Sequence, residues 1–220
     1  MTEPDVLTTT RRCLHGIAEH ILTAHQWRVA GTIRLAVLED GFATLALVAD
    51  PAVIEVRGTE LGTDRTAVPI TGTLGDLADR IGVEFGLVGA PYSPTSGCSA
   101  TDPAVVEGAA AAEIYSAWWA GRRAMEALAS QAQQSVTPVL WPEHFDLGIA
   151  LDEVNYGVSP GDDHLTHPYA YVGPWQPRVG DFWTESFGAA RPLRELGDSQ
   201  GVLEFFREGR ARAAADPVAS

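Results

Sequence analysis

The chain has 220 residues, 45% hydrophobic and 20% charged, with a formal net charge of −14, so it can bury a sizeable core and is too apolar for a disordered chain. The negative charge disfavours nucleic-acid phosphates and anionic membrane surfaces as partners, since both attract basic residues. No run of about 18 apolar residues is present to span a membrane, and the N-terminus lacks the features of a signal peptide, so we expect a soluble, acidic, cytoplasmic protein.

The first part of the chain has the pattern of a helix followed by short antiparallel strands. Apolar residues recur at helical spacing over residues 6–25. His15 and Glu19 are four apart, so they can meet as a solvated pair on the surface of that helix. Segments rich in β-forming residues follow at 32–38, 42–48, 53–57 and 65–70. Thr73 is a suitable N-cap for a short helix over residues 74–81.

A loop rich in Gly, Pro, Ser and Thr, residues 88–100, precedes a second helix. Asp102 and Pro103 suit the N-cap and first position of that helix. Its core-facing stripe follows a spacing of three and four and comprises Val106, Ala110, Ile114, Ala117, Gly121, Met125 and Leu128. Further strands are expected at 139–151, 154–158 and 169–172, with a last helix at 199–213 and a frayed tail after Ala214.

Both parts of the chain therefore contain a helix, several antiparallel strands and a helix. We predict an α+β fold of antiparallel sheet and packed helices in a single domain, residues 1–220. Residues 1–88 and 101–214 are predicted to form two α-β-α halves that share a core and are joined by the loop. A true repeat and a chance likeness both stay open, because short alternating strands often resemble one another.

The residue types themselves exclude several kinds of chemistry. All fifteen basic residues are Arg and none is Lys, which excludes pyridoxal phosphate bound as a lysine Schiff base and a Walker A lysine. The two cysteines, Cys13 and Cys98, form no C-x-x-C pair. Iron–sulfur clusters and thioredoxin-type redox chemistry are therefore not expected, whereas a single disulfide stays open.

The segment from residue 141 to 187 differs from the rest because it concentrates His, Trp and Tyr. Aromatic walls with a few well-placed polar groups are typical of a pocket for a small molecule. The residues predicted to line such a pocket are Trp141, Asn155, Tyr156, Tyr171, Trp175 and Trp183. We therefore expect a small-molecule enzyme or binding protein that uses this segment.

His144 and Asp146 are the candidate catalytic residues of that segment. On one strand their side chains would share a face, because strand side chains alternate with a period of two. Asp146 could then orient His144 as a general base. Together with His164 from the following loop, they could instead bind a divalent metal. The spacing of these residues matches no established zinc motif. The alternative is a purely structural pair of strands whose histidines lie on the surface.

The runs 139–147, 154–162, 168–175 and 182–183 resemble an uncharacterised actinobacterial family of conserved hypothetical proteins, with the pattern WPEHFD, VNYGVSPGD and PYAYVGPW. They are also distantly similar to a bacterial domain family of unknown function. Neither resemblance implies an activity, only that the segment is a family hallmark. The rival to the pocket hypothesis is therefore a non-catalytic protein-interaction or structural module, because Tyr and Trp also favour interfaces, including those of a homo-oligomer.

Overall fold

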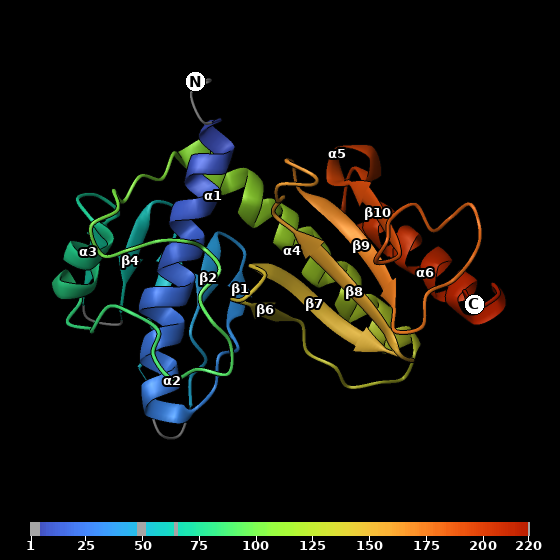
Figure 1. Ribbon diagram of the computed structural model, residues 1–220, viewed down its shortest axis with the longest axis horizontal. Coiled ribbons are helices and arrows are strands. Elements are labelled where there is room, and N and C mark those ends of the chain that lie inside the picture. The colour runs from blue at the N-terminus through green and yellow to red at the C-terminus, as the bar shows by residue number, and fades with distance from the viewer. Residues whose placement is uncertain (1–4, 48–51, 64–65, 220) are drawn as a thin grey trace. The chain divides into compact units, whose positions relative to one another are not determined.

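A computed structural model of the chain describes residues 5–47, 52–63 and 66–219 and confirms the α+β class (Figure 1). It contains two five-stranded antiparallel sheets together with several helices. The chain forms two compact units: unit 1 comprises residues 1–116 and 140–145, and unit 2 comprises residues 117–139 and 146–220. Among the described residues, no helix is long and apolar enough to cross a membrane.

The boundary between the units does not follow the expected halves. The loop at 88–100, which we expected to join two halves, belongs to unit 1. Helix α4 (Gly108–Gln131) instead passes from one unit into the other, because the division falls between Ser116 and Ala117. The first sheet lies within unit 1, and the strands of the second sheet from residue 146 onward lie within unit 2. The relation of the two units as a repeat stays a prediction.

Unit 1 begins with one uninterrupted helical segment made of α1 (Val6–Ile17), the π-helical turn η1 (Ala18–Thr23) and α2 (Ala24–Ala30). The backbone stays helical across both junctions, and Gly31 ends the segment at a φ of 65°, a left-handed conformation that suits glycine. The predicted helix is therefore confirmed and extends to Ala30. The π turn adds a residue to one turn and so changes which side chains face the core.

The strands of unit 1 are β1 (Ala36–Leu38), β2 (Gly41–Ala43), β3 (Glu55–Arg57), β4 (Glu60–Gly62) and β5 (Ala67–Pro69), paired in that order. The central residues of neighbouring strands lie opposite one another and form one apolar row: Val37, Phe42, Val56, Leu61 and Val68. The first four of these are buried, so this row faces the core of unit 1. Val48 and Arg65, at the ends of two expected strands, lie outside the described residues.

Helix α3 (Leu74–Arg80) begins as the sequence predicts. The Thr73 hydroxyl accepts a hydrogen bond of 3.1 Å from the Asp76 N–H, and the Asp76 carboxylate accepts one of 3.1 Å from the Thr73 N–H. This reciprocal pair is a capping box, which satisfies two backbone donors at the start of the helix.

Helix α4 starts later than predicted, at Gly108 rather than beside Asp102. The Glu107 carboxylate caps it by accepting a 2.9 Å hydrogen bond from the Ala110 N–H. The Asp102 carboxylate instead accepts hydrogen bonds from Arg12 at 2.8 Å and from the Ser99 hydroxyl at 3.1 Å. The predicted stripe is confirmed from Ala110 onward, where every member is buried, whereas Val106 precedes the helix.

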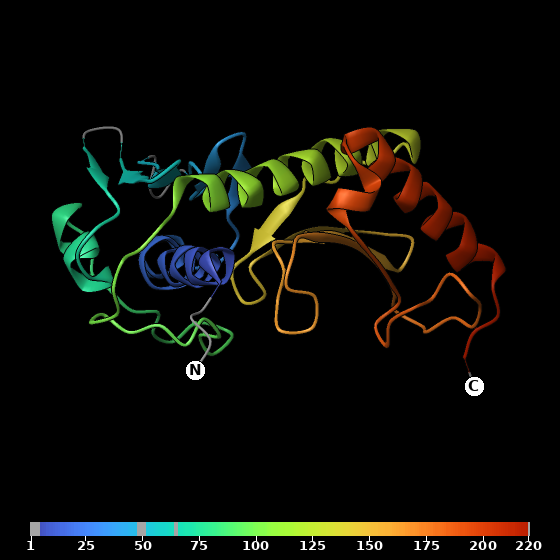
Figure 2. The same ribbon diagram turned by 90° about the horizontal axis from the view of Figure 1, so that it is seen from above.

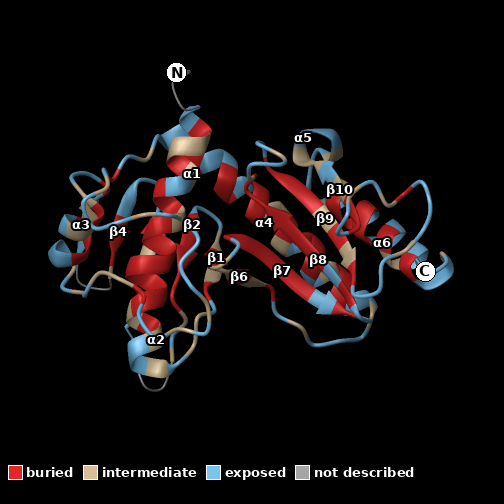
Figure 3. Cartoon of the chain, viewed as in Figure 1, coloured by how far each residue is buried: buried red, intermediate tan, exposed pale blue. Residues whose placement is uncertain are grey.

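The second sheet has the order β10-β9-β8-β7-β6, with bounds β6 (Val139–Trp141), β7 (Asp146–Leu151), β8 (Val154–Ser159), β9 (Tyr169–Pro174) and β10 (Ala189–Pro192). Two helices follow it, α5 (Leu193–Leu196) and α6 (Ser199–Ala215). Figure 3 shows the mostly buried residues of β7, β8 and β9. Strands are thus confirmed in the ranges expected at 139–151, 154–158 and 169–172. A turn at residues 142–145 divides the first range into β6 and β7.

Within unit 2, the later part of α4 and helix α6 cover the same face of the sheet (Figure 2). A β-carbon added to Gly121 of α4 would lie 2.5 Å from Val158, and one added to Gly209 of α6 would lie 2.7 Å from Val172. Both valines project from the face that also carries Tyr156, because Tyr156 lies opposite Val172 in the register. Glycine therefore permits close helix–sheet packing at both points.

The C-terminal tail of unit 2 is not frayed. The Val179 N–H donates to the Pro217 carbonyl at 2.9 Å, and the Ala219 N–H donates to the Pro177 carbonyl at 2.8 Å. The residues after α6 therefore pair with the segment that follows β9, which the apolar and polar pattern of the tail did not indicate.

Candidate functional site

The two predicted catalytic residues, His144 and Asp146, differ in secondary structure and in solvent exposure. His144 lies in the turn formed by residues 142–145 and is exposed, whereas Asp146 is the first residue of β7 and is buried. Phe145 between them has a φ of 53°, a left-handed conformation that strand residues do not adopt. The expectation that both side chains project from one strand is therefore wrong, because the strand starts only at Asp146.

Asp146 is paired with one of the predicted ligand-binding residues. Its carboxylate accepts a hydrogen bond from the Tyr171 hydroxyl. Burial raises the pKa of the Tyr171 phenol well above its usual value, and the nearby Asp146 charge adds to that effect, so the hydroxyl keeps its proton. Gly157 leaves room for the ring, since a β-carbon there would lie 2.2 Å from it. Sequence reasoning thus placed both residues in the site, and the structure brings them together inside unit 2.

His164, the third proposed metal ligand, has a different partner. Its Nε2 atom lies 2.8 Å from the Glu185 carboxylate at an exposed position. That hydrogen bond, with the Glu185 charge, raises the pKa of the His164 imidazole. In the described parts of the chain, no group of three or more His, Cys, Asp or Glu side chains is placed to hold a metal ion.

The other predicted ligand-binding residues do not line one pocket. Trp175 is 61% exposed, and its indole N–H donates to the Asn155 side-chain oxygen at 3.0 Å. Tyr156 is fully buried against Phe206, with ring centroids 5.6 Å apart. The remaining two are held elsewhere, Trp183 by a 3.0 Å hydrogen bond to Asp216 and Trp141 beneath the guanidinium of Arg34.

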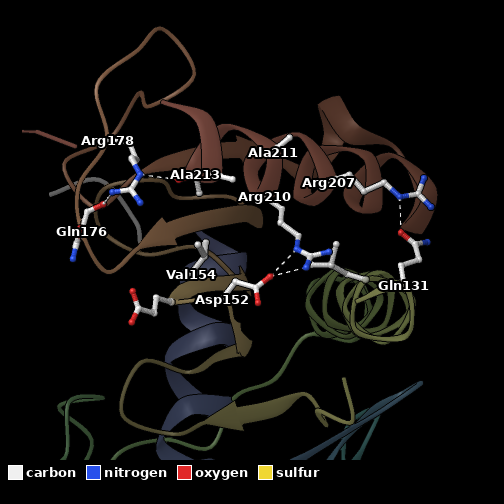
Figure 4. A pocket seen from close by; sticks show the side chains of 12 residues that line it. Gln131, Asp152, Val154, Gln176, Arg178, Arg207, Arg210, Ala211 and Ala213 are labelled. Carbon is white, nitrogen blue, oxygen red and sulfur yellow. Dashed lines mark hydrogen bonds and ion pairs between the residues drawn. The ribbon is translucent and has the colours of Figure 1, made fainter. Parts of the chain in front are cut away.

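A cavity of about 580 Å³ lies in unit 2, and we call it the arginine pocket (Figure 4). Its lining comes from α4, the β7–β8 turn, the segment after β9, and α6. The lining residues are Leu128, Gln131, Asp152, Glu153, Val154, Gln176, Arg178, Arg207, Arg210, Ala211, Ala213 and Ala214. Three of the fifteen arginines of an acidic chain thus lie in one concave site.

Arg210, at the centre of the pocket, is neutralised within the protein. Its Nε and Nη2 atoms donate to the same Asp152 carboxylate oxygen at 2.9 and 2.6 Å. Asp152 belongs to the β7–β8 turn and Arg210 to α6, so this ion pair joins the hairpin to the helix (Figure 4). It fixes the middle of the pocket rather than offering a charge to a ligand.

The other two arginines are held only by neutral groups. Arg207 donates from Nε to the side-chain oxygen of Gln131 at 2.9 Å. Arg178 donates to the backbone carbonyls of Ala213 and Gln176 at 2.8 and 3.0 Å, so it also satisfies a carbonyl in the last turn of α6. Within the described residues neither guanidinium has a carboxylate partner, so the pocket lining carries two unpaired positive charges, on Arg178 and Arg207, against one unpaired negative charge, on Glu153.

The β7–β8 turn that lines the pocket has an unusual backbone. Asp152 and Glu153 have φ values of 53° and 60°; Asp is common at the first of these positions, whereas the second normally has Gly, so Glu153 is the unusual residue. A left-handed conformation costs a residue other than glycine about 1–2 kcal/mol. Such residues are often found at functional sites. The turn contributes the side chains of Asp152 and Glu153 to the lining of the pocket.

Sequence reasoning did not find the arginine pocket. One signal was available: Arg207 and Arg210 are three apart in a helical pattern, so they share one side of α6. A second was the Asp152–Glu153 pair in a hairpin turn without glycine. The contribution of Arg178 depends on how the segment after β9 lies beside α6, and no local pattern reveals that.

Unit 1 contains a separate polar cluster around Glu19, which we expected to lie on the surface. The Glu19 side chain is fully buried, and His15 lies 3.7 Å from it. The Glu19 carboxylate accepts hydrogen bonds from the backbone N–H groups of Thr95 and Ser96, each at 2.9 Å. The expected exposure is wrong because Glu19 lies in the π turn, beneath this loop. The hydrogen bonds from Thr95 and Ser96 hold their loop against the helix, so the buried Glu19 carboxylate has a structural role.

Compared with known proteins, the chain matches no family model, no curated protein and no solved structure. A fold class alone does not define a function, because function depends on the geometry and chemistry of a site. The arginine pocket is the described site that combines a ligand-sized cavity with unbalanced charge, and it therefore carries the functional argument.

Proposed function

We propose that unit 2 binds a small organic anion, with a carboxylate or phosphate group, in the arginine pocket. The observation that supports this most directly is the pair of unbalanced guanidinium groups of Arg178 and Arg207 in one cavity. Two like charges in a concave site repel each other, and a bound anion offsets that repulsion. Arginine is well suited to the task because its planar fork binds carboxylate and phosphate through two hydrogen bonds.

The size and the apolar part of the lining fit such a ligand. Cavities that bind small molecules measure roughly 300–1,000 Å³, and this one is about 580 Å³. Leu128, Val154 and Ala211 offer apolar surface to a short carbon skeleton. The Arg210–Asp152 ion pair lies between the two free arginines and keeps α6 and the hairpin in place (Figure 4).

The test is to measure anion binding by calorimetry for the wild type and for Arg207→Gln. Succinate, glutarate and inorganic phosphate serve as probes. We expect the substitution to weaken binding at least tenfold because it removes one free charge. Arg212→Gln is the matched control, since Arg212 lies on the same helix, is paired with Glu208, and does not line the pocket.

Two results would contradict the proposed function. One is that none of the three probes binds the wild type at millimolar concentration. The other is that Arg207→Gln and Arg212→Gln weaken binding equally, which would indicate a general charge effect rather than a site.

A further inference from the structure

The two cysteines of the chain are far apart in sequence, but both line one cavity of unit 1. Cys13 lies on α1, and Cys98 lies in the loop at 88–100. The cavity measures about 300 Å³, and its lining also includes the apolar side chains of Leu74 and Val105. Both cysteines are free thiols in the described structure. The fold therefore brings the whole thiol content of the chain to one place.

The side chain of Cys98 lies against the backbone of α1 beside Cys13. Its thiol donates to the carbonyl of Arg12, the residue before Cys13, at 3.5 Å. A β-carbon added to Gly16 would lie 2.8 Å from Cys98 Sγ and 2.9 Å from Cys98 Cβ. Gly16 follows Cys13 by three residues, and residues at that spacing are neighbours on a helix surface. Glycine at this position thus leaves the room that Cys98 occupies next to Cys13.

Arg12 holds the two chain segments together at this point. Its guanidinium donates to the Gly97 carbonyl and to the Asp102 carboxylate, each at 2.8 Å. These bonds anchor the segment that carries Cys98 to the helical turn that carries Cys13. Little backbone entropy is therefore left to lose when the two side chains are joined.

We infer that Cys13 and Cys98 form a redox modification site, at which a peroxide converts the two thiols into an intramolecular disulfide. Cys98 reacts first, because it is half-buried whereas Cys13 is only 5% exposed. The Cys98 sulfur attacks hydrogen peroxide, the O–O bond breaks, and water leaves behind a sulfenic acid. The Cys13 sulfur then attacks Cys98, the S–O bond breaks, and a second water leaves. Two thiols are oxidised in total, and one peroxide is reduced to two waters.

The environment of the pair keeps it reduced until a peroxide is present. Burial raises the pKa of the Cys13 thiol to about 11 and also raises the pKa of Cys98. Because the thiolate is the reactive form, both cysteines react slowly at neutral pH and faster in alkaline solution. The disulfide joins α1 directly to the loop at 88–100, which Glu19 already holds through Thr95 and Ser96.

The experiment treats the reduced full chain with hydrogen peroxide at pH 8, blocks remaining thiols with iodoacetamide and measures the intact mass without reductant. The wild type should lose the mass of two hydrogen atoms, accept no iodoacetamide and yield a peptide that contains both cysteines. Dithiothreitol should reverse the change. Cys13→Ser should instead stop at the Cys98 sulfenic acid, which dimedone traps. Cys98→Ser should react with dimedone at least tenfold more slowly, because its remaining thiol is buried.

Three results for the wild type would overturn the inference: two thiols that persist after peroxide treatment, a disulfide between two chains, or two cysteines oxidised separately without a link. The wild-type measurement decides among these by itself, so the outcome does not depend on the folding of a variant. Equal dimedone labelling rates in Cys13→Ser and Cys98→Ser would refute Cys98 as the residue oxidised first. Far-ultraviolet circular dichroism of each variant verifies that it is folded.

Discussion

The carboxylate of Glu19 accepts a 2.9 Å hydrogen bond from the backbone N–H of Ser96, although the glutamate side chain is completely buried. Thr95 donates to the same carboxylate from its N–H at 2.9 Å and from its hydroxyl at 3.3 Å. The two partners are 76 and 77 residues from Glu19 in the chain. This relationship fixes the loop at 92–99 to the π turn of the first helix.

Glu19→Ala is expected to lower the free energy of unfolding by about 2–4 kcal/mol, because it leaves buried N–H donors unsatisfied and creates a cavity. Glu19→Gln should cost less, since the amide oxygen still accepts one of these bonds. Urea denaturation measures both. Glu39→Ala, at an exposed position of unit 1, is the control. Equal stability of Glu19→Ala and the control would contradict the structural role.

The stability of the chain should depend on pH through the buried histidines. Burial lowers the pKa of His20 below its usual 6.5, although the Glu19 charge partly opposes the shift. His20 Nδ1 also accepts a hydrogen bond from the Leu87 N–H at 3.5 Å, and protonation would break it. His15 is shifted in the same direction by burial. Below pH 6.5 the unfolded state therefore binds more protons than the folded state, and stability falls as the pH falls.

The measurement is the urea midpoint of the wild type and of His20→Gln between pH 8 and pH 5. The wild type should lose stability as the pH falls through 6.5, and the variant should lose less over the same range. A wild-type and His20→Gln difference that stays constant with pH would refute the assignment to His20.

Gly209→Ala should destabilise the chain by about 1–3 kcal/mol, the usual cost of overpacking a core. The added β-carbon would lie 2.7 Å from Cγ2 and 2.8 Å from Cγ1 of Val172, and the stiff valine cannot turn both methyl groups away. Gly108→Ala is the matched control, because its β-carbon would meet only a Thr59 methyl group at 3.9 Å. Thermal denaturation of the two variants tests this, and a Gly209→Ala variant as stable as the control would show that α6 can shift freely.

Glu153→Gly tests how much the left-handed backbone of the β7–β8 turn costs in stability. It should raise the free energy of unfolding by up to about 1 kcal/mol, because glycine adopts a positive φ without strain. Asp152→Gly should gain less, since it also removes the ion pair with Arg210. Urea denaturation of both variants measures the difference. A marked loss of stability in Glu153→Gly would show that this side chain supports the fold instead.

Much of the fold was predictable because local signals and tertiary packing agree. The Thr73 cap, the α4 stripe from Ala110 and the last helix follow from spacing alone. Strand β10 was missed because Ala189–Pro192 lacks β-branched residues and includes a proline. Strand β4, at Glu60–Gly62, is too short to show an alternation.

The candidate site was less predictable because it depends on positions far apart in sequence. His144 and Asp146 are two apart in sequence, but a turn rather than a strand precedes Asp146, so the period-two argument does not apply. Asp146 and Tyr171 meet only through the pairing of β7 with β8 and of β8 with β9. The arginine pocket additionally requires α6 to pack on β8 and β9, which no local pattern specifies.

The pairing of the tail with residues 177–179 has a practical consequence for how this protein is prepared. Arg178, whose side chain lines the arginine pocket, forms a backbone bridge with Val218. Trimming the last residues or fusing a purification tag to that end would disturb the strip of chain that carries this arginine. Ligand screens should therefore keep residues 216–219 and place any tag at the N-terminus, because a chain shortened before these residues would test a different pocket.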